Sequence, residues 1–355
     1  MPVNATRGLA VVVTLCLLAL SGCVSPGSSR EIKLGYASSS PIATILAAQQ
    51  RHSWQGHGLD VSLENVNDVG LSTSLLSGNQ VQFAHSAPTT VFAAVSQGAP
   101  VTILAGLGFG QGEHQGGYLA APASSGIAKL ADLRGKKVAL TGIGTSYDFY
   151  LRAKLAGVGL TVGKDVQFVP VPYPQMIGAL ATKQVDAAVL LAVDYAKLRA
   201  REPVNVLATS ADLANAPIEY TSCIVARTDW LVDHRQQAVD FLAGLLEAEK
   251  WLQQDIAQNQ GQQARALLQP ILRYDAPTMD SFYTYRLSDI GQEPELANLL
   301  GMPRDFVQPA IEALRAGGGL KGPVHVNYEN TVDLSYLREA YQKAGLTWND
   351  SAKFH

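Results

Sequence analysis

Short apolar segments alternate with longer mixed segments through the first half of the chain. Residues 32–36 and 61–66 have apolar side chains at alternate or adjacent positions, as strands do, and a helical pattern separates them. A second helical stretch leads to a third apolar strand, which includes Gln80 and Val81. This order predicts a strand, helix, strand, helix, strand unit whose right-handed crossovers produce a parallel sheet.

The same unit occurs a second time later in the chain. LLSGNQVQFA at 75–84 and ALATKQVDAA at 179–188 share Leu, Gln, Val and Ala at an offset of 104 positions. Apolar runs at 137–141 and 166–171 take the places of the first two strands in this second copy. The repeat predicts an α/β protein with two lobes, each with a parallel-core sheet flanked by helices, and a cleft between them.

From residue 227 onward the pattern changes to helices. In the first of them apolar residues recur at helical spacing, at Val239, Leu242, Leu245 and Leu246. Pro- and Gly-containing breaks separate four further expected helices, at residues 257–268, 295–300, 306–316 and 334–344. This tail contains no third copy of the repeat, so it is expected to dock on one of the lobes.

A positive charge followed by an apolar run opens the chain. The apolar residues 8–20 are too few to span a membrane and are typical of a secretory signal. The run ends in LSGC at 20–23, which resembles the bacterial lipobox, whose small residues admit the signal peptidase and whose cysteine accepts lipid. We expect a signal peptide at 1–22, lipid on Cys23 and a flexible tether at 23–30. An ordinary secretory signal that contains a cysteine by chance is the alternative.

The length, cysteine count and charge fit this organisation. Removing the first 22 of the 355 residues leaves 333, enough for two lobes of common domain size. Cys223 is then the only thiol in the folded body, so we expect no internal disulfide and a buried packing role for Cys223. The formal net charge of −3 argues against a nucleic-acid partner.

Several motifs together carry a resemblance to a known family. They are LADLRGKKVAL at 130–140, GLDVSL at 58–63, SGNQVQFA at 77–84, AAVSQGAPVTIL at 93–104 and KQVDAAVL at 183–190. In order and spacing they resemble the periplasmic solute-binding proteins of the nitrate, sulfonate, taurine and thiamine-pyrimidine group. One departure concerns the ligand: the family usually has a Glu-Pro pair after its second QVDA strand, where this chain has LLAVDY at 190–195.

The resemblance implies a two-lobed type II periplasmic-binding-protein fold with two hinge crossings. The first crossing is expected near 117–122 and the return near 221–227. The first lobe would then be discontinuous and the second continuous, with boundaries at 31–116 plus 226–355, and at 117–225.

Sheet topology locates a ligand site independently of the family. In open parallel sheets ligands lie beyond the carboxyl ends of the strands, where helix N-termini point. Three of the four loops after the first and third strand of each lobe are rich in hydroxyl groups, and none contains Lys or Arg, which suits a singly charged oxyanion. The candidate ligand-binding residues are Ser38, Ser39, Ser40, His85, Ser86, Thr89, Thr145, Ser146, Tyr147, Asp194 and Tyr195.

Some of these residues have structural interpretations as well. Hydroxyl side chains also cap helix N-termini, and this alternative applies to Ser40, Ser86, Thr145 and Ser146. Asp148 follows Thr145 at capping-box spacing and is interpreted as structural. His85 and His114 are interpreted as core or solvated histidines rather than metal ligands.

The ligand is expected to lie between loops of the second lobe and those of the first. Its acidic head is placed at Thr145 and Ser146, and its other end near Asp194 and Tyr195. Asp194 would accept a hydrogen bond from an amine or ring N–H, and Tyr147 and Tyr195 could cover an apolar part.

The implied function is that of an exported, lipid-anchored solute-binding protein of an ABC importer. It would bind a small organic anion or zwitterion as a monomer, with an ABC permease and ATPase as partners and the membrane reached through lipid on Cys23. Import of a pyrimidine or aromatic carboxylate, ligand sensing without transport, and an enzyme on the same fold are the alternatives. The sequence contains no Walker A, H-E-x-x-H, G-x-S-x-G or C-x-x-C motif, so no enzyme, cofactor or metal is predicted.

Overall fold

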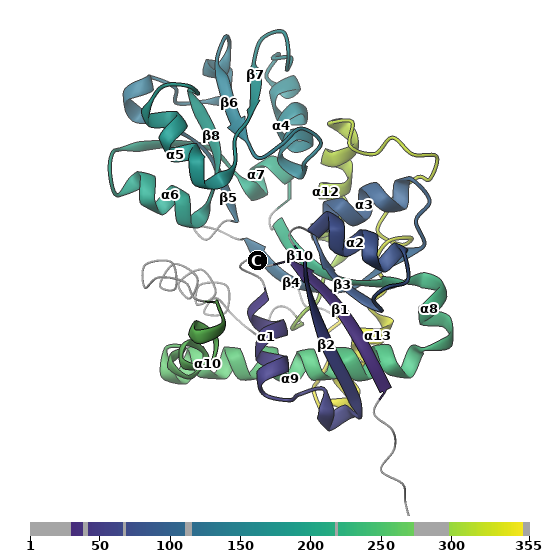
Figure 1. The fold of residues 1–355 in the computed structure, drawn as a ribbon. Coiled ribbons are helices and arrows are strands. Elements are labelled where there is room, and N and C mark those ends of the chain that lie inside the picture. Colours follow the sequence, from purple (N-terminus) through teal and green to yellow (C-terminus); the bar gives the residue numbers. More distant parts are fainter. Residues whose placement is uncertain are drawn as a thin grey trace, which may run out of the picture.

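Two five-stranded sheets, each with helices on both faces, form the described part of the protein (Figure 1). The computed structural model describes residues 30–37, 42–66, 69–110, 116–216, 219–272 and 298–350. The first sheet lies in the lower half of Figure 1 and the second in the upper half. Within these ranges, no helix combines the length and the apolar character that crossing a membrane requires.

The first sheet contains four strands that run in one direction, three of them side by side, and one strand that runs against them. Its strands are β1 (Arg30–Ala37), β2 (Leu59–Val66), β3 (Phe83–Ser86), β4 (Val101–Gly110) and β10 (Glu219–Arg227). They lie in the order β2-β1-β3-β10-β4, and β1 pairs in parallel with both β2 and β3. β10 pairs antiparallel with β3 and β4.

The second sheet has the same pattern. Its strands are β5 (Gly117–Pro122), β6 (Lys137–Leu140), β7 (Gln167–Pro170), β8 (Ala187–Leu191) and β9 (Val204–Thr209). Their order is β7-β6-β8-β5-β9. β6 pairs in parallel with β7 and β8, and β5 pairs antiparallel with β8 and β9.

The two sheets therefore follow one plan, with a strand exchanged between them. The parallel trio of each sheet confirms the duplicated unit, but the complete sheets are mixed because β10 and β5 take equivalent places as antiparallel strands. The segments expected as hinge crossings, 117–122 and 221–227, are themselves strands inside the sheets. The chain changes sheet just before each of them, between β4 and β5 and between β9 and β10.

Helices join the strands of each sheet. Those beside the first sheet are α1 (Ala43–Gln50), α2 (Val69–Ser77) and α3 (Pro88–Ser96). Those beside the second are α4 (Ser146–Gly157), α5 (Tyr173–Ala181), α6 (Ala192–Arg199) and α7 (Ser210–Ala214). Short 3₁₀ helices lie at η2 (Gln55–His57), η3 (Ala123–Ser125) and η4 (Leu130–Leu133).

The tail is helical, as its apolar pattern predicted. Its helices are α8 (Thr228–Asp233), α9 (Arg235–Asn259), α10 (Gln262–Leu272), α12 (Arg304–Ala316) and α13 (Ser335–Lys343). The prediction of one helix over 257–268 is wrong, because Gln260 and Gly261 adopt positive φ angles of 54° and 74° and separate α9 from α10. Of the helix expected at 295–300, residues 295–297 lie outside the described ranges and the rest is not helical.

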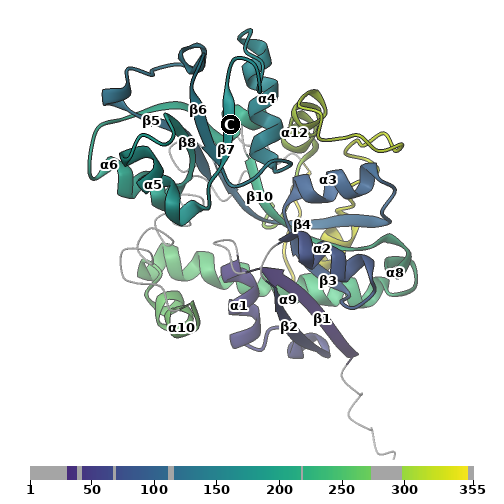
Figure 2. The same ribbon diagram turned by 45° about the horizontal axis from the view of Figure 1, so that its top comes forward.

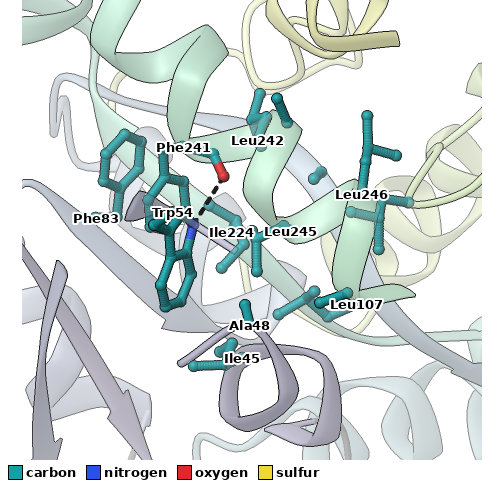
Figure 3. Packing of buried hydrophobic residues seen from close by; sticks show 14 of the residues in the cluster. Ile45, Ala48, Trp54, Phe83, Leu107, Ile224, Phe241, Leu242, Leu245 and Leu246 are labelled. Atoms are coloured by element: carbon teal, nitrogen blue, oxygen red, sulfur yellow. Dashed lines mark hydrogen bonds between the residues drawn. The ribbon is translucent and has the colours of Figure 1, made fainter. Parts of the chain in front are cut away.

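Helix α9 packs on α1 and the first sheet through a large apolar cluster (Figure 3). In this cluster the Trp54 ring stacks on Phe241 at a centroid distance of 5.3 Å, and its Nε1–H donates to the Phe241 carbonyl oxygen at 3.0 Å. A Cβ atom at Gly244 of α9 would overlap the Trp54 ring. A glycine therefore sets how closely α9 approaches the body of the first lobe.

A second apolar cluster extends from one sheet to the other. It includes Phe92 of α3, Leu151 of α4 and Leu314 of α12. Helix α12 contacts α3 beside the first sheet and also α4 and α7 beside the second, and it lies next to α4 in both ribbon views (Figures 1 and 2). The tail was expected to dock on one lobe, but it packs on helices of both.

Candidate ligand-binding site

Each sheet has a point where successive helices leave toward opposite faces. In the first sheet β1 leads to α1, which packs on α9, whereas β3 leads to α3, which packs on α2 and α12. In the second, β6 leads to α4, which packs on α12, whereas β8 leads to α6, which packs on α5. Because ligands of open α/β sheets bind at such switch points, the carboxyl ends of β1, β3, β6 and β8 form the candidate site.

Part of the predicted site lies outside the described residues. Ser38, Ser39 and Ser40, which follow β1, belong to this undescribed part, as do Cys23 and His114. The remaining candidates lie at the ends of β3, β6 and β8 or in the first turns of the helices that follow.

The N-termini of α3 and α4 meet between the two lobes. Thr89 is the second residue of α3 and Ser146 the first of α4, and their half-buried side-chain oxygens are in hydrogen-bonding contact. A helix N-terminus presents unbonded N–H groups and the positive end of the helix dipole. Two such ends at one point create a region that favours a negatively charged group.

Thr145 and Asp148 cap helix α4. The Thr145 hydroxyl donates to the Gly142 carbonyl oxygen at 2.9 Å and accepts from the Asp148 N–H at 3.4 Å. The buried Asp148 carboxylate accepts from the Gly144 N–H at 2.8 Å and from Arg152 Nε at 2.6 Å. The structural interpretation of both residues is confirmed, although the carboxylate bonds Gly144 rather than the backbone of Thr145.

Ser86 is a buried strand residue and does not cap a helix. Its Oγ lies 2.7 Å from Oγ1 of Thr73 in α2, and its carbonyl oxygen accepts the Cys223 thiol at 3.4 Å. Helix α3 begins after Ala87, which offers no capping side chain, so the capping interpretation of Ser86 is wrong. Cys223 is fully buried and burial raises the pKa of its thiol, which confirms the expected packing role.

His85 is fully buried near the carboxyl end of β3. Neither ring nitrogen has a hydrogen-bond partner among the described residues. Desolvation lowers the pKa of the imidazole to about 4, so the ring is neutral at neutral pH. The β3–β10 register places Ile224 directly opposite His85.

Tyrosine side chains gather at the candidate site of the second lobe. Tyr118 of β5 and Tyr195 of α6 stack with a centroid distance of 4.1 Å and an interplanar angle of 21°. The Tyr147 ring of α4 lies over Gly117, where a Cβ atom would come within 2.6 Å of the Tyr147 hydroxyl oxygen. The second lobe therefore contributes aromatic surface from three different elements.

Asp194 lies in the first turn of α6 and is 8% exposed. Its carboxylate is 3.5 Å from Nζ of Lys197, one turn further along the helix. The carboxylate thus has a local partner, which the loop sequence alone did not indicate. No group of three or more His, Cys, Asp or Glu side chains placed to hold a metal occurs in the ranges that the structure describes.

Sequence reasoning missed residues that the antiparallel strands bring to the site. Thr221 and Ser222 stand on β10, next to β3, and Tyr118 stands on β5, next to β8. Their hydroxyl groups were present in the segments identified as hinges. These segments insert beside β3 and β8 through strand pairing over a long sequence separation. The periodicity of apolar residues does not reveal such pairing.

Comparison with known proteins identifies a family and several similar proteins. A family model described as NMT1/THI5 like matches residues 39–257. A protein of Brucella abortus (strain 2308) that carries a binding-protein name is 25% identical over 220 residues, which cover 61% of this chain and 66% of that protein. The chain therefore spans just under two thirds of the length of this relative.

Solved structures share the fold at low sequence identity. The periplasmic sulfonate-binding protein SsuA from Methylobacillus flagellatus KT matches with a TM-score of 0.68 and 16% identity over 92% of this chain and 99% of that chain. The periplasmic nitrate-binding protein NrtA from Synechocystis PCC 6803 matches with a TM-score of 0.64 and 16% identity over 88% of each chain. At these identities the likeness concerns the fold, and it confirms the two-lobed periplasmic-binding architecture.

Proposed function

The chain belongs to the NMT1/THI5 like family, and from this premise we propose that it is an extracytoplasmic solute-binding protein of an ABC importer. It captures a small organic anion or zwitterion, of the sulfonate, taurine or nitrate kind, between its two lobes and delivers it to a permease and ATPase. It works as a monomer and performs no catalysis. The sulfonate- and nitrate-binding proteins that share its fold support this proposal.

The observation that carries the proposed ligand class is the meeting of two helix N-termini at Thr89 and Ser146. Two positive dipole ends at one point repel each other unless a negative group lies nearby. An anionic head bound there would accept hydrogen bonds from both hydroxyl groups and face the positive end of the α4 dipole. Binding would thereby draw the two lobes together.

Among the described residues, two cations of α4 and α6 have carboxylate partners of their own. Arg152 of α4 bonds Asp148 at 2.6 Å, and Lys197 of α6 lies beside Asp194. The ligand charge is then offset by helix dipoles and hydroxyl groups, which suit one negative charge better than two. We accordingly favour a monoanion or zwitterion.

The proposal includes the organisation of the whole chain. Residues 31–116 and 226–355 form the first lobe and residues 117–225 the second. A signal peptide at 1–22 is removed and lipid on Cys23 holds the protein at the outer side of a membrane. The LSGC sequence and the Ser- and Gly-rich residues that follow it support this part.

A second candidate ligand class is favoured by the tyrosines of the second lobe. The stacked Tyr118 and Tyr195 and the nearby Tyr147 offer ring faces to a flat ligand. A pyrimidine or an aromatic carboxylate would use this surface, and an aromatic carboxylate would also present an anionic head to Ser146.

Native mass spectrometry of the purified protein, followed by a thermal-shift panel, tests the proposal. The panel contains alkanesulfonates, taurine, nitrate, aromatic carboxylates and aminopyrimidines. A ligand at roughly 100 times its dissociation constant should stabilise the folded state by about 2.7 kcal/mol. Ser146→Ala should weaken binding of the best anion by about 1–3 kcal/mol, because a charged group loses a hydrogen bond.

A second variant and two negative outcomes complete the test. Asp194→Asn should weaken binding of amine-bearing ligands and leave binding of simple anions unchanged or improved, because a negative acceptor becomes neutral. The proposed ligand class is wrong if the protein carries no small molecule and no compound moves the melting curve. Normal binding by both variants would show that the ligand lies elsewhere.

A further inference from the structure

Buried polar atoms without hydrogen-bond partners gather on two neighbouring strands of the first sheet. They are both ring nitrogens of His85 on β3, and the side-chain oxygens of Thr221 and Ser222 on β10, none of which has a partner in the described part of the chain. A buried polar group without a partner costs about 1–3 kcal/mol, so proteins contain few of them. Their concentration at the end of β3, beside a switch point, indicates a partner that is not part of the fold.

Strand register places His85 and Ser222 on the same face of the sheet. Ile224 is directly opposite His85, and Ser222 lies two residues from Ile224, so its side chain points to the same side. Such diagonal neighbours are usually about 7–8 Å apart. This separation is too long for a direct hydrogen bond and short enough for one small group to bond both side chains.

On the opposite face of the same strands, Ser86 and Cys223 have hydrogen-bond partners. There the Ser86 hydroxyl contacts Thr73, and the Cys223 thiol donates to the Ser86 carbonyl oxygen. His85 and Ser222 are the two unpartnered side chains that share one face.

The chemistry of His85 restricts what can bind there. Because the buried imidazole is neutral at neutral pH, it offers one donor nitrogen and one acceptor nitrogen. The Ser222 hydroxyl can donate or accept. A sulfonate, nitrate or carboxylate group has acceptors alone and can bond only the N–H of this ring, whereas a hydroxyl or amide group has both a donor and an acceptor and can bond either ring nitrogen.

We propose that His85 and Ser222 recognise an uncharged polar group at the end of the ligand remote from its acidic head. This inference rests on the proposed function and narrows its ligand class to bifunctional molecules. Such a molecule carries one anionic group for the helix ends at Thr89 and Ser146, and a hydroxyl or amide group for His85 and Ser222.

Matched pairs of compounds test this inference by isothermal titration calorimetry at pH 7.5. Ethanesulfonate is compared with 2-hydroxyethanesulfonate, and benzoate with 4-hydroxybenzoate and 4-carbamoylbenzoate. In at least one series the compound with the polar group should bind roughly tenfold or more tightly than its apolar partner, as expected for one well-formed buried hydrogen bond. In His85→Phe and in Ser222→Ala, the ratio of the two affinities within that pair should fall toward one.

Ser96→Ala is the matched control, because Ser96 is also a buried serine of the first lobe but bonds the Ala93 carbonyl oxygen near the far end of α3. It should leave the ratio unchanged. If His85→Phe does not fold, the affinity ratios of Ser222→Ala and Ser96→Ala are compared. A lower ratio in Ser222→Ala alone supports the inference.

Two results distinguish a failure of the role proposed for His85 and Ser222 from a failure of the proposed binding function. Equal affinities within each series, or a ratio that both variants leave unchanged, would overturn the role of His85 and Ser222 and assign their hydrogen bonds to buried water. The proposed binding function would then stand. Absence of binding by every compound would overturn this inference and the proposed anionic head together.

Discussion

Thr89 of α3 and Ser146 of α4 touch through their hydroxyl groups, although 57 residues separate them in the sequence. One helix follows the last parallel strand of the first repeat unit, and the other follows the first strand of the second. The contact therefore joins the two lobes at the point where both present positive helix ends. Its strength can be measured directly.

We predict an energetic coupling between these two side chains. Thr89→Val and Ser146→Ala should each lower the free energy of unfolding by about 0.5–1.5 kcal/mol, because each removes one partner of the hydrogen bond. The double variant should lose less than the sum, with a coupling of about 0.5–1 kcal/mol. Urea titrations of the four proteins measure this, and strictly additive losses would contradict the contact.

Gly244→Ala should destabilise the protein, although alanine normally favours a helix over glycine. The added methyl group would overlap the Trp54 ring inside the first cluster, and overpacking of this kind costs about 1–3 kcal/mol. Gly178→Ala in α5 is the control, because no atom lies within 4 Å of the new Cβ. It should be neutral or stabilising by roughly 0.5–1 kcal/mol. Equal melting temperatures for the two variants would contradict this packing.

His85 should make stability depend on pH between about pH 4 and pH 6.5. Its folded pKa of about 4 lies below the unfolded value of 6.5, so the unfolded chain binds more protons in this range. The contribution is complete above the unfolded pKa and is lost as the pH falls toward 4. It amounts to about 3 kcal/mol for a fully buried imidazole.

His85→Gln removes the titrating group and provides the comparison for this effect. The wild-type free energy of unfolding should fall by about 3 kcal/mol more than that of the variant between pH 7 and pH 4. Chemical denaturation at several pH values measures the difference. Parallel pH profiles would show that His85 is not held neutral by burial.

Lipid attachment should depend on one of the three cysteines alone. Cys23→Ala should leave the protein unprocessed or release it from membranes, because stable attachment needs the acyl chains that Cys23 is proposed to carry. Cys16→Ala is the control and should remain membrane-bound, since Cys16 precedes the proposed cleavage site. Membrane fractionation and intact mass measure both variants, and an unchanged mass for Cys23→Ala would refute lipidation there.

Local sequence patterns were sufficient for the elements and their repetition. The alternation of short apolar runs and helical stretches predicted the parallel trios β2-β1-β3 and β7-β6-β8. The Thr145-x-x-Asp148 spacing predicted the cap of α4, which forms within a single turn. These features depend on interactions between residues close in the chain, so the sequence records them directly.

Tertiary structure decided which distant residues share the candidate site. Ser222 lies beside His85 because β10 inserts next to β3 after the chain has returned from the other lobe. Similarly, α12 packs on helices of both lobes, and the partners of Ser86 come from α2 and β10. No local pattern specifies these pairings, because they follow from the joint packing of two lobes and from strand register over long separations. The sequence by itself thus determined the units and their chemistry, and the folded chain decided which of those groups meet.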